Sequence, residues 1–112
     1  MPAQPFTVQI RPARERLVVA VCGEIDLATA PQVEAAVIDA VADGWTRVVI
    51  DLRAVSFMDS AGVHLLLALL ALRALGARGV SCQMIDGRPE VHSVLELCGH
   101  GDVIARVDPA VL

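Results

Sequence analysis

The order of apolar and polar residues along the chain predicts alternating strands and helices. Five segments have the apolar content or the two-residue alternation that is typical of strands: 6–10, 17–22, 47–52, 80–84 and 103–107. The first two segments, separated by the stretch 11–15, predict an antiparallel hairpin. The unbroken apolar residues Val48, Val49 and Ile50 indicate a central parallel strand that is buried on both faces of a sheet.

Three segments between these strands have helical periodicity. The first helix is expected to begin at Thr29, because Thr29-Ala30-Pro31-Gln32 has the form of a capping box, and to stop at Gly44. Its apolar face would contain Val33, Ala36, Val37, Ala40 and Val41. The second helix is expected over 60–75 and the third over 89–98. This order predicts an α/β fold, with a mixed sheet of about five strands and three main helices packed against it.

The second predicted helix is apolar almost all round. A helix that lies on one face of a sheet needs only one apolar stripe, yet Leu65, Leu69 and Leu72 form a second stripe beside the first. This second stripe either packs against the third helix or meets a protein partner. A homodimer formed through this helix is one of the possibilities.

Length and composition narrow the class of protein. The 112 residues predict a single domain, 1–112, with a core over about 6–107. Although 55% of the residues are hydrophobic, no apolar run has the length of a membrane span, and the first residues lack the pattern of a secretory signal. We therefore expect a soluble, cytoplasmic protein without a membrane span.

Charge and side-chain chemistry exclude several functions. The net charge of −4 argues against a nucleic-acid partner. All 9 basic residues are arginine, and the absence of lysine excludes a P-loop, Schiff-base catalysis and a lysine-completed aspartyl-phosphate site. Cys22, Cys82 and Cys98 are widely spaced and do not combine with the histidines at zinc spacing. No metal, cofactor or disulfide scaffold is expected.

The motif Asp59-Ser60-Ala61-Gly62 lies where a strand-like run gives way to the second helix. Backbone N–H groups at a helix start are unpaired, and the helix dipole favours negative charge there. Ser60 is therefore either a helix cap or a hydroxyl placed to carry a phosphate. A serine-hydrolase nucleophile is not expected, because Met58 stands where the nucleophile elbow has glycine.

Three motifs in this order resemble the STAS domain of bacterial anti-sigma factor antagonists: 23–31 (GEIDLATAP), 48–52 (VVIDL) and 55–62 (VSFMDSAG). The resemblance extends over about 6–107 and implies a small mixed sheet with helices against it. It also implies a protein that is not an enzyme. In this family the unphosphorylated form binds an anti-sigma factor that is also a serine kinase and so frees a sigma factor. Phosphorylation switches this binding off, and a serine phosphatase resets it.

Carried over by position, the resemblance makes Ser60 the phosphorylated residue. Asp59 precedes it and Asp26 of the first motif is expected nearby, with Ala61, Gly62 and His64 completing the surroundings of the switch. Relatives often have a second small hydroxyl residue where this chain has Ala61, which leaves Ser60 the sole acceptor in the motif.

His64 also departs from the family pattern. It is either a solvated helix residue or a determinant of partner choice that adds pH sensitivity, since an imidazole ordinarily titrates near pH 6.5. The alternative function is a STAS interaction subunit of a transporter or sensory complex that is not phosphorylated. The intact Asp59-Ser60 pair is the feature that favours the antagonist.

Overall fold

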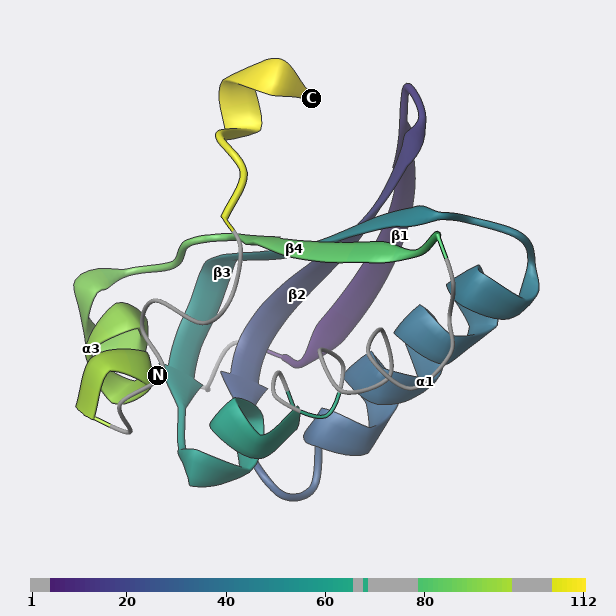
Figure 1. Cartoon of the computed structure of the whole chain (residues 1–112). Helices are drawn as coiled ribbons and strands as arrows, with labels where there is room; N and C mark the ends of the chain where they lie inside the picture. Colours follow the sequence, from purple (N-terminus) through teal and green to yellow (C-terminus); the bar gives the residue numbers. More distant parts are fainter. Residues whose placement is uncertain (1–4, 66–67, 69–78, 98–105) are drawn as a thin grey trace.

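Four of the five predicted strands form one mixed sheet. The computed structural model describes residues 5–65, 68, 79–97 and 106–112. Its four strands lie in the order β1 (Thr7–Ala13), β2 (Arg16–Ile25), β3 (Arg47–Met58) and β4 (Ser81–Ile85) (Figure 1). β1 and β2 pair antiparallel, whereas β2 with β3 and β3 with β4 pair in parallel. The hairpin and the central parallel strand of the sequence prediction are confirmed.

The predicted fifth strand is reduced to one bridge in the described part of the chain. Arg106 pairs in parallel with Met84, and the Val107 N–H donates to the Met84 carbonyl at 3.0 Å. Residues 103–105 of this predicted strand lie outside the described residues. The described sheet therefore has four strands rather than about five.

Three strands are longer than predicted, and β2 is one of them because it continues past Cys22 to Ile25. β1 continues through the stretch that was expected to be a turn, so the turn is confined to Arg14 and Glu15, with Arg14 at a φ of 60°. β3 continues past Leu52 to Met58. The β2–β3 register shifts twice, and Arg53 and Ala54 are both exposed. These irregularities interrupt the two-residue alternation, so the apolar pattern ended before the strand did.

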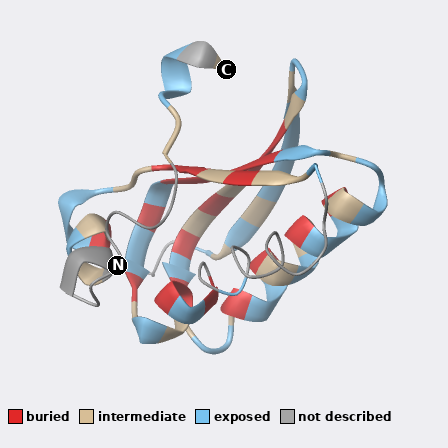
Figure 2. Ribbon diagram, viewed as in Figure 1, coloured by how far each residue is buried: buried red, intermediate tan, exposed pale blue. Residues whose placement is uncertain are grey.

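Helices cover one face of the sheet. They are α1 (Ala30–Ala42), α3 (Pro89–Leu97) and a helix that begins at Ser60 and is described over 60–65 and 68. α1 and the start of the helix at Ser60 lie on the same side of the sheet (Figure 1). The buried residues gather along the inner side of α1 and the middle of the sheet (Figure 2). The predicted second stripe of the second helix lies mostly outside the described residues and stays a prediction.

The end of α1 confirms the predicted glycine stop. Gly44 has a φ of 99°, a conformation that favours glycine. Its N–H donates to the Val41 carbonyl at 3.0 Å, and the Trp45 N–H donates to the Ala40 carbonyl at 3.1 Å. This pair of bonds is a Schellman motif, which satisfies two carbonyls at the helix end.

The opposite face of the sheet carries a smaller cluster. Val18, Val49 and Ile85 are buried there against Ala13, Val107 and Leu112. The short 3₁₀ helix η1 (Pro109–Val111) lies on this side of the sheet, away from α1 (Figure 1). Among the residues described, no helix has both the length and the apolar character that a membrane crossing requires.

Candidate functional site

Two of the sequence motifs meet at one edge of the sheet. Ile25, at the end of β2, pairs with Met58, at the end of β3. Because the two strands are parallel, the chain leaves both of them at the same edge. The Asp59 N–H also donates to the Ile25 carbonyl at 3.3 Å. The loop that holds Asp26 and the helix that starts at Ser60 are therefore neighbours.

Asp59, rather than Ser60, caps the helix. Its Oδ1 accepts a hydrogen bond from the Ala61 N–H at 2.9 Å, and its carbonyl accepts from the N–H groups of Gly62 and Val63. The bonds from Ala61 and Gly62 satisfy two of the donors that a helix start leaves unpaired, and the bond from Val63 is the first regular bond of the helix. The interpretation of Ser60 as a cap is corrected: both residues are good cap formers, and the first of the two takes the position.

Ser60 is the first residue of the helix and is exposed. Within the described residues its hydroxyl has no hydrogen-bond partner. The side chain is therefore accessible, while the backbone on which it stands is held by the bonds of Asp59.

Gly62 allows the helix to start close to the strand ends. A Cβ at this buried position would overlap Met58 Cγ and would lie 3.2 Å from Ile25 Cγ2. Both of those side chains are buried in the core. The absence of a side chain at Gly62 thus holds the helix start against β2 and β3, and Gly62 is not itself accessible to a partner.

The loop after β2 is built around Asp26. Its Oδ1 accepts hydrogen bonds from the Ala28 and Thr29 N–H groups at 2.9 and 3.0 Å. The Thr29 hydroxyl donates to the Glu24 carbonyl at 2.7 Å and accepts from the Asp26 N–H at 2.9 Å. Thr29 precedes α1 but makes no side-chain cap bond, so the predicted capping box is wrong. Its hydroxyl closes the loop instead of capping the helix.

This ordered loop presents Leu27, which the sequence analysis did not single out. Leu27 is 82% exposed, and the backbone on both sides of it is held by the bonds of Asp26 and Thr29. The detectable signal was a large apolar residue between Asp26 and Thr29, in the short loop that follows β2. An exposed apolar side chain on a rigid loop is a typical binding anchor, because little ordering remains to be done on binding.

A groove of about 300 Å³ runs beside Leu27 and the start of the second helix. Its lining residues are Leu27, Ala30, Pro31, Glu34, Ala61, His64, Leu65 and Ala68. The groove therefore connects the two motifs and includes two of the predicted switch residues, Ala61 and His64. A larger hollow of about 430 Å³ between β1 and α1 contains none of them.

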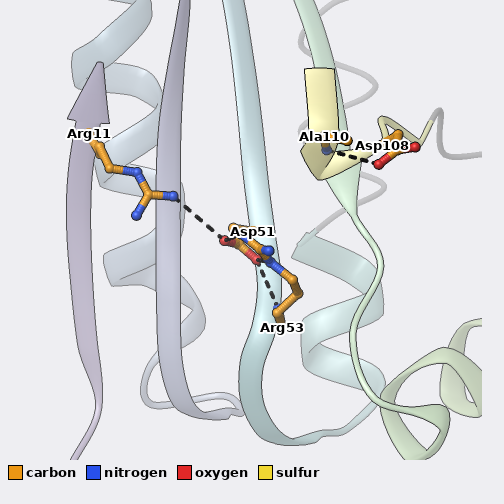
Figure 3. A network of polar contacts seen from close by, with 5 residues as sticks. All are labelled: Arg11, Asp51, Arg53, Asp108 and Ala110. Atoms are coloured by element: carbon orange, nitrogen blue, oxygen red, sulfur yellow. Dashed lines mark hydrogen bonds and ion pairs between the residues drawn. The ribbon is translucent and has the colours of Figure 1, made fainter. Parts of the chain in front are cut away.

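A second polar cluster lies on the opposite face of the sheet. Arg53 donates to both oxygens of Asp51, at 3.0 and 2.8 Å, and Arg11 reaches across β2 to within 4.0 Å (Figure 3). Burial on its own raises the pKa of Asp51. The hydrogen bonds from the side chain and backbone of Arg53, with the positive charges of Arg53 and Arg11, outweigh burial and hold that pKa below its ordinary value. Asp51 thus stays charged and is fully paired.

The described residues were also compared with the side-chain groups that bind metal ions. No group of three or more histidine, cysteine or acidic side chains there could hold a metal ion. Cys82 is a buried core residue, and Cys98 lies outside the described residues.

Sequence comparison relates the chain to anti-sigma factor antagonists. The Anti-sigma-F factor antagonist RsfB of Mycobacterium tuberculosis is 44% identical over 63 residues, which are 56% of this chain and 52% of RsfB. The match therefore spans about half the length of that relative.

Solved structures extend the likeness to most of the chain. An anti-sigma factor antagonist from Mycobacterium paratuberculosis is 32% identical, with a TM-score of 0.76 and coverage of 91% of this chain and 85% of that chain. The antagonist SpoIIAA in its unphosphorylated form is 27% identical, with a TM-score of 0.73 and coverage of 94% and 91%. Bacillus SpoIIAA in the phosphorylated form is 26% identical, with a TM-score of 0.64 and coverage of 94% and 95%. The STAS domain family model matches residues 6–111, and the chain belongs to this family.

Proposed function

We propose that this protein is an anti-sigma factor antagonist whose binding is switched off by phosphorylation of Ser60. The observation that carries the proposal is the accessible Ser60 hydroxyl on a backbone that Asp59 holds in place. SpoIIAA, a similar antagonist, exists in a phosphorylated form. The unphosphorylated protein binds an anti-sigma factor that is also a serine kinase and frees its sigma factor. A serine phosphatase restores the active form.

The partner docks on the surface that joins the two motifs. Leu27 is the apolar anchor, and the adjacent groove accepts an apolar side chain of the anti-sigma factor. Ser60 lies on the same helix start as Ala61, which lines that groove. The kinase can therefore reach the hydroxyl from the surface that it binds.

A phosphate on Ser60 breaks this contact without unfolding the domain. It adds about −1.5 to −2 charges at neutral pH, beside the carboxylate of Asp59. The helix dipole tolerates negative charge at this end of the helix. A partner packed over Ser60 would have to remove water from the phosphate and meet the charges of Asp59 and Asp26, which is unfavourable unless new partners are supplied. Binding is lost and the fold remains.

The test is phosphorylation and binding with candidate anti-sigma kinases. Incubation with kinase and ATP, followed by mass spectrometry, should place one phosphate on Ser60, and none on the Ser60→Ala variant. Ser60→Asp should weaken partner binding by tenfold or more, whereas Ser93→Asp, with the same charge on the exposed side of α3, should bind as the wild type does. Equal affinity of Ser60→Asp and wild type would contradict the switch.

The docking surface has its own variant pair. Leu27→Ala should weaken binding of the unphosphorylated protein, because it removes the exposed anchor. Ile38→Ala removes another exposed apolar side chain, on α1 and outside the groove, and should leave affinity unchanged. If a partner binds through Leu27 but no kinase modifies Ser60, the protein is a STAS interaction subunit that is not phosphorylated.

A further inference from the structure

His64 lies one helical turn after Ser60 and lines the groove. The helix is continuous over 60–65, and both Ser60 and His64 are exposed. Residues four apart in a helix are neighbours, with about 5–6 Å between their Cβ atoms. His64 also lines the groove, together with Ala61 and Leu27. One side chain therefore borders both the candidate phosphorylation site and the candidate docking groove.

The charges around His64 favour it as a partner for an anion on Ser60. Among the described residues that line the groove, Glu34 of α1 is the acidic one and His64 is the one that can become a cation. At the helix start, Asp59 Oδ1 is engaged by the Ala61 N–H. Within the described residues, a phosphate on Ser60 would thus have one titratable cation on its own helix face, His64.

We propose that His64 is the counter-ion of a phosphate on Ser60: its imidazole lines the docking groove in the unphosphorylated protein and pairs with the phosphate in the phosphorylated protein. This inference rests on the proposed phosphorylation of Ser60. His64 would then connect the phosphate to the groove. An imidazole that pairs with the phosphate cannot at the same time contact a partner side chain in the groove.

The pairing has a defined dependence on pH. An imidazole ordinarily titrates near pH 6.5, and the second ionisation of a phosphoserine lies near pH 6. A dianionic phosphate favours the imidazolium, so phosphorylation moves the titration of His64 to higher pH. The pairing needs the dianionic phosphate and the imidazolium together, so it is strongest from about pH 6 up to the new midpoint of His64 and is lost as the pH rises through that midpoint.

The test uses protein that carries phosphoserine at position 60, introduced during translation, so that no kinase is needed. The imidazole ring protons are titrated by NMR with and without the phosphate. The His64 midpoint should move upward by about 0.3 to 1 pH unit, while the other two histidines serve as internal references. An unchanged His64 midpoint would overturn the inference and would leave the kinase and binding tests of the proposed function standing.

Thermal unfolding supplies a second measurement. Tm is measured for the wild type and for His64→Gln, each with and without the phosphate on Ser60. At pH 6 the phosphate should lower Tm more in His64→Gln than in the wild type. At pH 8.5 it should lower Tm by the same amount in both. Glu34→Gln is the matched control. It removes an acidic residue of the groove lining but leaves His64 in place, so the phosphate should change Tm in this variant as it does in the wild type. An effect of the phosphate that is independent of His64 at pH 6 would refute the pairing.

Discussion

Asp51, in the middle of β3, and Asp59, directly after that strand, are carboxylates on the same stretch of chain with different partners. Asp51 is 7% exposed and is bound through both oxygens by Arg53, with Arg11 close by. Asp59 is half-buried and accepts a backbone N–H of the helix that follows it. The first carboxylate is neutralised by cations, whereas the second organises a helix start.

The difference separates a structural cluster from a candidate switch. In the Asp51 cluster each acceptor oxygen already has a cationic donor, so the cluster stabilises the sheet and has no unengaged group for a partner. At the strand ends, Asp26 and Asp59 bond to backbone N–H groups and leave the neighbouring side chains of Leu27 and Ser60 exposed. Rigid backbone with accessible side chains is what a binding site on loops requires.

The largest expected effect comes from Asp51→Asn. An amide cannot replace the charged bonds to Arg53, so we expect a loss of about 1.5 to 3 kcal/mol in the free energy of unfolding at pH 7. Urea unfolding monitored by circular dichroism measures it. Binding of an anti-sigma factor should be unaffected in the folded fraction, because Asp51 lies on the face of the sheet opposite α1.

The effect of Asp51→Asn on the free energy of unfolding should depend on pH. The pKa of Asp51 is lowered in the folded protein, so its contribution to stability is present above the ordinary pKa and is lost as the pH falls through the lowered value. The unfolding free energies of wild type and Asp51→Asn should therefore begin to converge below about pH 4 and should meet only below the lowered pKa of Asp51. A constant difference between pH 7 and pH 2 would show that the substitution acts through packing and not through charge.

A smaller loss is expected from Asp59→Ala. Removal of the oxygen that accepts the Ala61 N–H should cost about 0.5 to 2 kcal/mol, the usual range for an N-cap. Asp59→Asn is the matched control, because asparagine caps as well as aspartate does and only the charge is removed. If Asp59→Asn were as unstable as Asp59→Ala, the carboxylate charge rather than the cap would be responsible.

Several features were predictable because they depend on long apolar patterns or on strong local signals. The central strand was visible in three consecutive apolar residues, and Gly44 marked the end of α1 because its positive φ strongly favours glycine. The position of Ser60 at a helix start followed from the change in periodicity. These features need little knowledge of tertiary contacts.

Other features required the tertiary structure. Asp59 and Ser60 are adjacent and equally suited to capping, so only the placement of the helix start against Met58 and Ile25 decides between them. The Thr29 hydroxyl could have accepted an N–H of α1 as a cap, but it accepts the Asp26 N–H and donates to the Glu24 carbonyl within the loop instead. The groove between Leu27 and His64 joins segments far apart in the chain, and no local pattern reports such a contact.

Ser60→Ala should have the smallest effect on stability and the clearest effect on regulation. The Ser60 hydroxyl has no partner among the described residues, so its removal should change the unfolding free energy by no more than about 0.5 kcal/mol. Side by side in urea unfolding, Ser60→Ala should match the wild type while Asp59→Ala is destabilised. A loss above 1 kcal/mol in Ser60→Ala would assign the cap to the serine. We also expect Ser60→Ala to stay bound to its partner in the presence of ATP. Because its stability is unchanged, the missing phosphate acceptor alone would explain that result.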